Sequence, residues 1–305
     1  MAFTSYILPI ASLGVFDLNL PLLVNSGESP KVLIINNIHG DELTGYYVLQ
    51  KLLSGFSDFK NKITIIPSAN PLGLIQRTRF VPLDNADPNR GYPNPLQARG
   101  ATSALREKLI RLAVGYDVII DLHTFMRPCL SAGLLLPQAN DKNNDMVKRC
   151  LAVSKMDTII KMDIKNTEKR VESALGIYLI KQYGKIVIPL EYPPIRQIKN
   201  DDELNKLTNG LRNILAVVSG DKTSPSTMVP IFERQMVMSP TTGLFVPLKL
   251  LGDKISVGDS IGLLINPKNL KSTTVVAPFS GVIIEMADRQ LYIFGEKLAT
   301  IGRSV

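Results

Sequence analysis

The feature that most constrains the fold is a regular alternation of two kinds of segment between residues 31 and 218. Short runs of apolar, β-branched residues alternate with longer segments in which apolar residues recur at helical spacing. Such runs are typical of strands buried on both faces, because they lack the polar residues of a half-exposed strand. The sequence therefore predicts an α/β domain in which helices flank a parallel or mixed sheet.

The expected elements can be given by residue range. The predicted strands are 32–36, 63–68, 117–122, 133–136 and 185–190. The predicted helices are 42–54, 101–114, 143–154, 172–183 and 202–218. The apolar segment before residue 25 lacks the basic start of a signal peptide and contains Asp17 and Asn19, so it predicts one or two edge strands instead.

Both histidines of the chain stand at the ends of predicted strands. His39 follows the run 32–36, and His123 ends the run that begins at Val118. Because the carboxyl ends of strands in an open α/β sheet line one crevice, we expect the two imidazoles to converge. A lone histidine at a strand end is more often a structural residue that makes hydrogen bonds. Two at equivalent ends, in a chain with no others, favour a shared metal ion.

Glu42 is the third potential ligand. Asp41 is the expected N-cap of the following helix, which places His39 and Glu42 in the turn between strand and helix. An imidazole and a carboxylate from one turn, together with a second imidazole, form a ligand set that zinc takes. The sequence therefore predicts one zinc ion, bound by His39, Glu42 and His123, with a fourth position for water.

The segment 70–100 is long and rich in Asn, Pro, Asp and Arg. A loop of this length inside a compact domain is usually functional or disordered. An arginine binds a carboxylate through its planar pair of donors, and a neighbouring aspartate can orient it. The residues expected at the substrate are Arg79, Asp87, Asn89 and Arg90. A solvated loop with scattered surface ion pairs is the alternative, and the sequence weighs the two about equally.

Glu191 ends the predicted strand 185–190 and reaches the same rim of the sheet. A carboxylate beside a catalytic zinc can take the proton of the water that the metal activates and pass it to the leaving nitrogen. Glu191 is therefore the expected general base. A solvated glutamate at a strand end is an equal alternative on spacing alone.

After the polar stretch 219–226, helical spacing gives way to short apolar runs with Gly and Pro. Segment 239–245 resembles 277–283, and segment 258–262 resembles 295–298. Two copies of one pattern predict a small β-sandwich or half-barrel with pseudo-twofold symmetry. It is similar to the hammerhead domains that carry biotin or lipoate, but the attachment lysine is missing. The predicted domains are 1–222, the hydrolase domain, and 223–305, the all-β domain.

Charge and cysteine content narrow the class of protein. The net charge of +8 permits an anionic substrate, but the basic residues are scattered and no DNA- or RNA-binding motif accompanies them. No run approaches the length of a membrane-spanning helix. Cys129 and Cys150 have no CxxC spacing and fit a reducing compartment. We expect a cytoplasmic protein that binds neither nucleic acid nor membrane.

Taken together, several short motifs resemble the succinylglutamate desuccinylase/aspartoacylase family, a branch of the zinc carboxypeptidase fold. The motifs are His39-Gly40-Asp41-Glu42 with Gly45, Asn70-Pro71, Arg79, Asp87-x-Asn89-Arg90, Asp121-Leu122-His123 and Glu191. The resemblance implies that His39, Glu42 and His123 bind zinc and that Glu191 is general base and acid. It implies that Arg79, Asn89 and Arg90 hold the substrate carboxylate and polarise the scissile carbonyl.

The reaction implied by this resemblance is hydrolysis of the amide, or an ester, of a small anionic N-acyl amino acid. Arg90, or Arg79, would offset the charge that develops on the tetrahedral oxygen. The C-terminal domain would cap the active site, unless it serves only to stabilise or to form a homo-oligomer. Two other functions stay open: a zinc carboxypeptidase for short peptides, and a non-catalytic protein whose loop 70–100 binds an anion.

Overall fold

The computed structural model describes residues 3–12, 14–55, 60–92, 100–162, 172–221, 223 and 228–305. The strands of its first part are β1 (Thr4–Ser12), β2 (Asp17–Val24), β3 (Glu28–Asn36), β4 (Asn61–Ile66), β5 (Val118–Thr124), β6 (Ala132–Leu135), β7 (Thr158–Lys161) and β8 (Ile186–Tyr192). The helices are α1 (Thr44–Ser54), α2 (Pro71–Gln76), α3 (Ala101–Val114), α4 (Asp141–Val153), α6 (Leu175–Tyr183) and α7 (Asp201–Val218), with the 3-10 helix η1 (Ile195–Gln197). The predicted α/β alternation is confirmed.

The centre of the sheet is parallel and its margins are mixed. Strands β4, β3, β5 and β8 are neighbours and run parallel. β6 joins β8 in the antiparallel sense, and β7 runs parallel to β6. β1 and β2 form an antiparallel hairpin at the edge beside β4, which confirms the edge strands expected before the first core strand.

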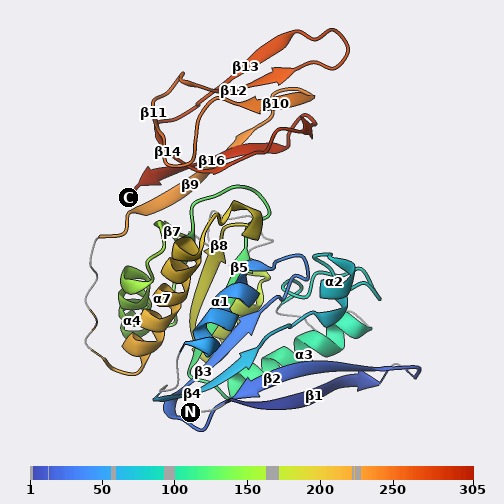
Figure 1. The fold of residues 1–305 in the computed structure, drawn as a ribbon, viewed down its shortest axis with the longest axis vertical. Helices are drawn as coiled ribbons and strands as arrows, with labels where there is room; N and C mark the ends of the chain where they lie inside the picture. The colour runs from blue at the N-terminus through green and yellow to red at the C-terminus, as the bar shows by residue number, and fades with distance from the viewer. Residues whose placement is uncertain are drawn as a thin grey trace.

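Helices cover both faces of this sheet (Figure 1). α3 and α6 pack on one face, whereas α1, α4 and α7 pack on the other. In β3, Leu33 and Ile35 face the first layer, while Val32 and Ile34 face the second. All four are buried, and this is why the strand shows no polar alternation in the sequence. Among the described residues, no helix combines the length and the apolar character that crossing a membrane requires.

The turn after β3 differs from its prediction. The helix α1 begins at Thr44, and its N-cap is Leu43, which makes no side-chain cap; Asp41 is therefore not the N-cap. Asn37 explains the delay, because its backbone is left-handed (φ 57°) and its Nδ2 donates to the carbonyls of His39 (2.9 Å) and Glu42 (3.0 Å). These bonds hold an ordered turn before the helix, so the chain presents both potential ligands from one fixed loop.

Besides the 3-10 helix η1, two elements were missing from the prediction. Helix α2 lies inside the segment expected to be a loop, with Asn70 as its N-cap accepting from the backbone of Gly73 (3.0 Å) and Pro71 at its first position. Strand β7 is only four residues long and carries too short a pattern to be separated from the loops around it. Both elements are short, and their stability comes from neighbours distant in sequence.

The C-terminal part is all-β, as predicted. Its strands are β9 (Ile231–Met238), β10 (Gly243–Pro247), β11 (Lys254–Ile255), β12 (Ser260–Ile265), β13 (Ser272–Val276), β14 (Gly281–Met286), β15 (Leu291–Tyr292) and β16 (Lys297–Ser304). The internal repeat has a structural counterpart, since β10 pairs with β12 and β14 pairs with β16, both antiparallel. The first pair lies in a separate four-stranded sheet and the second in the large sheet, with a common apolar core.

The large sheet continues from the first part into the second. β9 pairs with β7 in parallel, and the order beyond it is β16, β14 and β11, so twelve strands form one sheet (Figure 1). The backbone of β14 also bonds to the segment after β5, through Leu130 N to Ile284 O (2.9 Å) and Met286 N to Pro128 O (3.0 Å). These bonds fix the C-terminal strands beside the segment that follows His123.

Candidate metal centre

The carboxyl ends of β3, β5 and β8 lie together because these strands are parallel neighbours. His39 follows β3, and His123 and Glu191 are near the ends of β5 and β8. In the register of this sheet, His123 and Glu191 stand opposite each other. The two imidazoles therefore converge, as the sequence predicted, with their ring centroids 5.2 Å apart.

Glu42 lies between the two imidazoles. Its Oε1 is 2.6 Å from Nδ1 of His39, and its Oε2 is 3.0 Å from Nδ1 of His123 and accepts a bond from the backbone of Thr124 (3.0 Å). The three side chains have potential ligand atoms within 4.8 Å of one another, and all three are buried. Two imidazoles and a carboxylate that converge in this way form a zinc-type donor set.

Each imidazole is held on its outer side by a further carboxylate. Nε2 of His39 lies 3.2 Å from Oδ1 of Asp87, and Nε2 of His123 lies 3.0 Å from Oδ2 of Asp121. A carboxylate at the outer nitrogen is the usual device that fixes the tautomer and the orientation of a metal-bound histidine. With both Nε2 atoms engaged, the Nδ1 atoms are the ones that face the centre, and the donor set fits a divalent cation.

The charges of the cluster stabilise one another. Burial raises the pKa of Glu42, but the two imidazoles outweigh it and hold that pKa well below its usual range. Burial lowers the pKa of His123, whereas Asp121 and Glu42 raise it well above its usual value. Burial also raises the pKa of Asp87, and its contacts with His39 and Arg79 hold it below the usual range. A site with more carboxylates than imidazoles favours a bound cation, which displaces the imidazole protons.

The predicted substrate residues of segment 70–100 surround this cluster. Arg79 donates from Nε to Oδ2 of Asp87 (2.9 Å), and its Nη1 lies 3.7 Å from Oε1 of Glu42. Asn89 bonds through its backbone N to Oδ1 of Asp87 (2.9 Å). Arg90 donates from Nη1 to the carbonyl of Asn89 (2.7 Å). The described part of the segment is therefore bonded to the residues of the cluster, which a solvated surface loop would not be, whereas residues 93–99 lie outside the described residues.

A cavity of about 520 Å³ opens beside the cluster. The residues proposed from the sequence that line it are His39, Glu42, Arg79, Asn89, Arg90, His123 and Glu191. Asp87 is not among the lining residues, because its carboxylate is turned toward His39 and Arg79. The role of Asp87 at the substrate, expected from the sequence, stays a prediction.

Burial raises the pKa of Glu191 to about 7, and the nearby Glu42 acts in the same direction. The imidazole of His123 and the guanidinium of Arg234 lower it and so limit the rise. A carboxyl group with a pKa near neutrality can both accept and return a proton at physiological pH. Glu191 therefore lies in the cavity beside the cluster with a pKa near neutrality.

Three lining residues come from the C-terminal strands, and the sequence reasoning missed them: Arg234, Glu285 and Lys297. Lys297 and Glu285 form an ion pair of 2.6 Å, and Thr300 donates to the same carboxylate (2.9 Å). Arg127, which follows β5, bonds to the carbonyl of Lys297. The sequence held one signal, a glutamate inside the apolar strand 281–286, but nothing in it located that strand beside His123.

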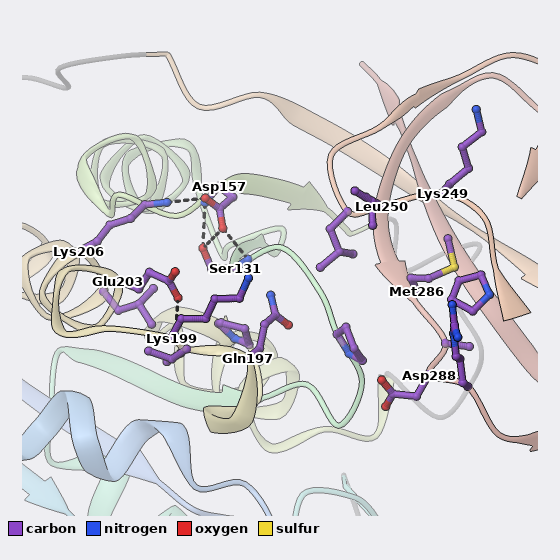
Figure 2. Close-up of a pocket in the computed structure, with 18 residues that line it drawn as sticks. Ser131, Asp157, Gln197, Lys199, Glu203, Lys206, Lys249, Leu250, Met286 and Asp288 are labelled. Atoms are coloured by element: carbon purple, nitrogen blue, oxygen red, sulfur yellow. Dashed lines mark hydrogen bonds and ion pairs between the residues drawn. The ribbon is translucent and has the colours of Figure 1, made fainter.

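A second cleft, of about 670 Å³, lies between the α7 side of the first part and the C-terminal strands (Figure 2). Figure 2 shows Asp157 between Ser131 and Lys206, with Leu250 and Met286 across the cleft. Oδ2 of Asp157 accepts from the backbone and the hydroxyl of Ser131 (2.9 and 2.7 Å), and Lys206 pairs with the same carboxylate. These groups hold structure together, and none of the residues of the metal cluster lines this cleft.

The model of one protein family, the succinylglutamate desuccinylase/aspartoacylase catalytic domain, matches residues 28–218. The chain belongs to this family. The matched range contains both histidines, Glu42, the segment of Arg79 to Arg90, and Glu191. It ends at the last residue of α7, before the C-terminal strands begin.

Among characterised proteins, the chain is similar to the N-alpha-acetyl-L-2,4-diaminobutyric acid deacetylase of Halomonas elongata, with 31% identity over 105 residues. This match spans 33% of the chain and 30% of the deacetylase. Among solved structures, a succinylglutamate desuccinylase/aspartoacylase from Rhodobacter sphaeroides superposes with a TM-score of 0.82 at 17% identity, over 99% of this chain and 95% of the other. The product-bound ectoine utilization protein EutE of Ruegeria pomeroyi gives 0.81 at 19% identity, over 99% and 95%. These likenesses extend the shared fold to the C-terminal strands.

Proposed function

We propose that this protein is a zinc-dependent deacylase that hydrolyses the amide bond of a small, anionic N-acyl amino acid. The observation that carries the proposal is the cluster of His39, Glu42 and His123, with a carboxylate behind each imidazole and Glu191 at the same rim. The relative from Halomonas elongata is named as a deacetylase of an N-acetylated amino acid, and this supports the substrate class.

One zinc ion per chain would be held by Nδ1 of His39, Nδ1 of His123 and the carboxylate of Glu42. Bound zinc in such a site lowers the pKa of water and polarises a carbonyl group. Asp87 and Asp121 keep the imidazoles oriented by accepting from their outer nitrogens. The protein thus supplies a buried donor set whose three side chains already lie together.

Glu191 is proposed to take the proton from the attacking water and to return it to the leaving nitrogen. Its raised pKa suits both steps, because the group gains and loses a proton near neutral pH. Arg90, or Arg79, would donate to the oxygen on which charge develops. Arg79 and Asn89 also stand where they could hold the carboxylate of the substrate, and Asp87 fixes Arg79 from behind.

The C-terminal strands are proposed to act as a wall that restricts the site to small substrates. Arg234, Glu285 and Lys297 line the cavity from that side, and an open groove for a peptide would need this side free. This favours a deacylase over a carboxypeptidase. The domain division at 222/223, hydrolysis of esters, a cytoplasmic location and a homo-oligomer stay predictions.

A screen of purified protein over N-acyl amino acids and short peptides, with and without added zinc, tests the proposal. We expect zinc-dependent release of amino acid from the N-acyl substrates and little cleavage of the peptides. Metal analysis of protein purified without chelator should give about one zinc per chain. Absence of bound zinc and of turnover would leave the anion-binding alternative, and preferential cleavage of peptides would favour the carboxypeptidase.

A further inference from the structure

The cavity beside the proposed metal ligands is lined by both charged and apolar side chains. The charged ones include Arg79, Arg90 and Lys297, and Arg234 on β9, the strand next to β7. The apolar ones lie at the end of the cavity that is formed by β6, by the residue after β7 and by the start of α6. The apolar side chains that line it are Leu134, Leu136, Met162, Ala174 and Ile177.

The apolar end lies on the same face of the sheet as the metal ligands. His123 on β5, Pro189 on β8 and Leu134 on β6 all line the cavity, and these three strands are consecutive in the sheet. In the register of the sheet, Leu134 is two strands across and two residues along from His123, which places it roughly 12 Å away. Glu191 is opposite His123 on the strand between them. A substrate centred at Glu191 would therefore have one end within reach of the apolar side chains.

The apolar end is built into the fold. The start of α6 is bonded to the site, because the backbone N of Leu175 donates to Oδ1 of Asn89 (3.0 Å). Met162, Ile177 and Leu136 are buried members of the main apolar core. Gly176 also lines the cavity, and a side chain there would press on Val187, since a Cβ would lie 3.1 Å from its Cγ1. Gly176 thus lets the start of α6 pack closely on the sheet, and core packing fixes the walls of this end of the cavity.

We propose that this end of the cavity is a subsite for an apolar group of the substrate, either a medium-length acyl chain or the apolar side chain of the amino acid. The inference rests on the proposed deacylase function and names its substrate more closely. An apolar group at this end would displace water from apolar surface, whereas a substrate that is polar at both ends would gain nothing there. The arginines that line the cavity would bind the carboxylate of the same molecule.

Two substrate series, assayed on the zinc-loaded full-length protein, separate the two sources of the apolar group. The first varies the acyl chain from acetyl to hexanoyl on a single amino acid, and the second varies the amino acid of N-acetyl substrates from alanine to norleucine and phenylalanine. A buried methylene is worth about 0.8 kcal/mol, or roughly a fourfold gain, so one series should rise in kcat/KM by on the order of 100-fold. Flat or falling values in both series, with turnover present, would overturn the subsite and leave the deacylase standing.

A binding measurement decides the inference even without turnover. Calorimetric titration should give hexanoate at least a tenfold lower Kd than acetate, because both share the carboxylate and differ only in apolar length. Equal affinities would overturn the subsite. Preferred hexanoate binding without hydrolysis of any N-acyl amino acid would support the subsite and contradict the proposed function, so the two failures are distinct.

Three variants test whether the preference for hexanoate over acetate arises at the apolar end of the cavity. Ala174→Leu should fill the apolar end and reduce the hexanoate preference about tenfold, and Leu134→Asn should reduce it by making the same surface polar. Ala152→Leu is the matched control, since Ala152 is a half-buried alanine on α4, across the sheet from the cavity. It should keep the preference of the unmodified protein. A preference in Ala174→Leu and Leu134→Asn equal to that of the control would place the binding elsewhere and overturn the proposal.

Discussion

Replacing Asp121 with Asn tests whether the outer carboxylates position the ligands. Asp121 is 5% exposed, and its Oδ2 lies 3.0 Å from Nε2 of His123. The asparagine keeps the volume but removes the charge that fixes the ring. Loss of such a partner typically weakens metal binding by about 10- to 100-fold, or roughly 1.4–2.7 kcal/mol. Competition with a chromophoric chelator at pH 8 measures the zinc affinity directly.

At lower pH, a second effect of Asp121→Asn on the zinc affinity opposes the first. Asp121 helps to raise the pKa of His123 well above its usual value, and zinc must displace that proton. The affinity of the unmodified protein should therefore fall as the pH is lowered, and Asp121→Asn should fall less steeply, so that the two converge at lower pH. Asp117→Asn is the control, because Asp117 precedes β5 and its carboxylate accepts from the backbone N of Lys31 (2.7 Å), away from the cluster. An affinity of Asp121→Asn equal to that of the control at pH 8 would refute the positioning role.

Three further results are expected. Arg90→Ala should lower kcat by about 10²- to 10³-fold, as loss of an oxyanion donor does, with little change in the free energy of unfolding; matched losses of activity and stability would count against a catalytic role. In zinc-free protein, the raised pKa of Glu191 stabilises the folded state. This stabilisation is complete below pH 4.5, the usual pKa of a glutamate, and it is lost as the pH rises through about 7. Between pH 4.5 and 8 the unmodified protein should therefore lose up to about 3 kcal/mol more stability than Glu191→Gln, measured by urea denaturation, and parallel profiles would contradict the raised pKa. Zinc at 100 times its Kd should stabilise the protein by about 2.7 kcal/mol, whereas His123→Ala should gain much less, and an equal gain would point to another site.

The main elements of the first part could be predicted because their patterns are local. The run 32–36 is apolar throughout, since Leu33 and Ile35 meet one helical layer while Val32 and Ile34 meet the other. The convergence of the histidines followed from one general rule, that parallel strands present their carboxyl ends at one edge. The repeat in the C-terminal part could also be recognised in the sequence, and it corresponds to two antiparallel strand pairs in different sheets.

The features that could not be predicted from the sequence depend on contacts between distant segments. The pairing of β7 with β9 brings the C-terminal strands to the site, and no local pattern specifies that neighbour. The lining residues Arg234 and Lys297 were missed for this reason. The N-cap assigned to Asp41 was wrong because Asn37 organises a longer turn through its side chain. The contact between Asp87 and His39 could be known only from the folded loop.

The central claim is that the two imidazoles and Glu42 share one zinc ion. Diffraction data from crystals of the zinc-loaded protein, collected on both sides of the zinc absorption edge, test it most directly. We predict a single anomalous peak per chain, about 2.0–2.2 Å from Nδ1 of His39, Nδ1 of His123 and a carboxylate oxygen of Glu42. A peak bound by other residues, or none at this cluster with zinc in excess, would contradict the account.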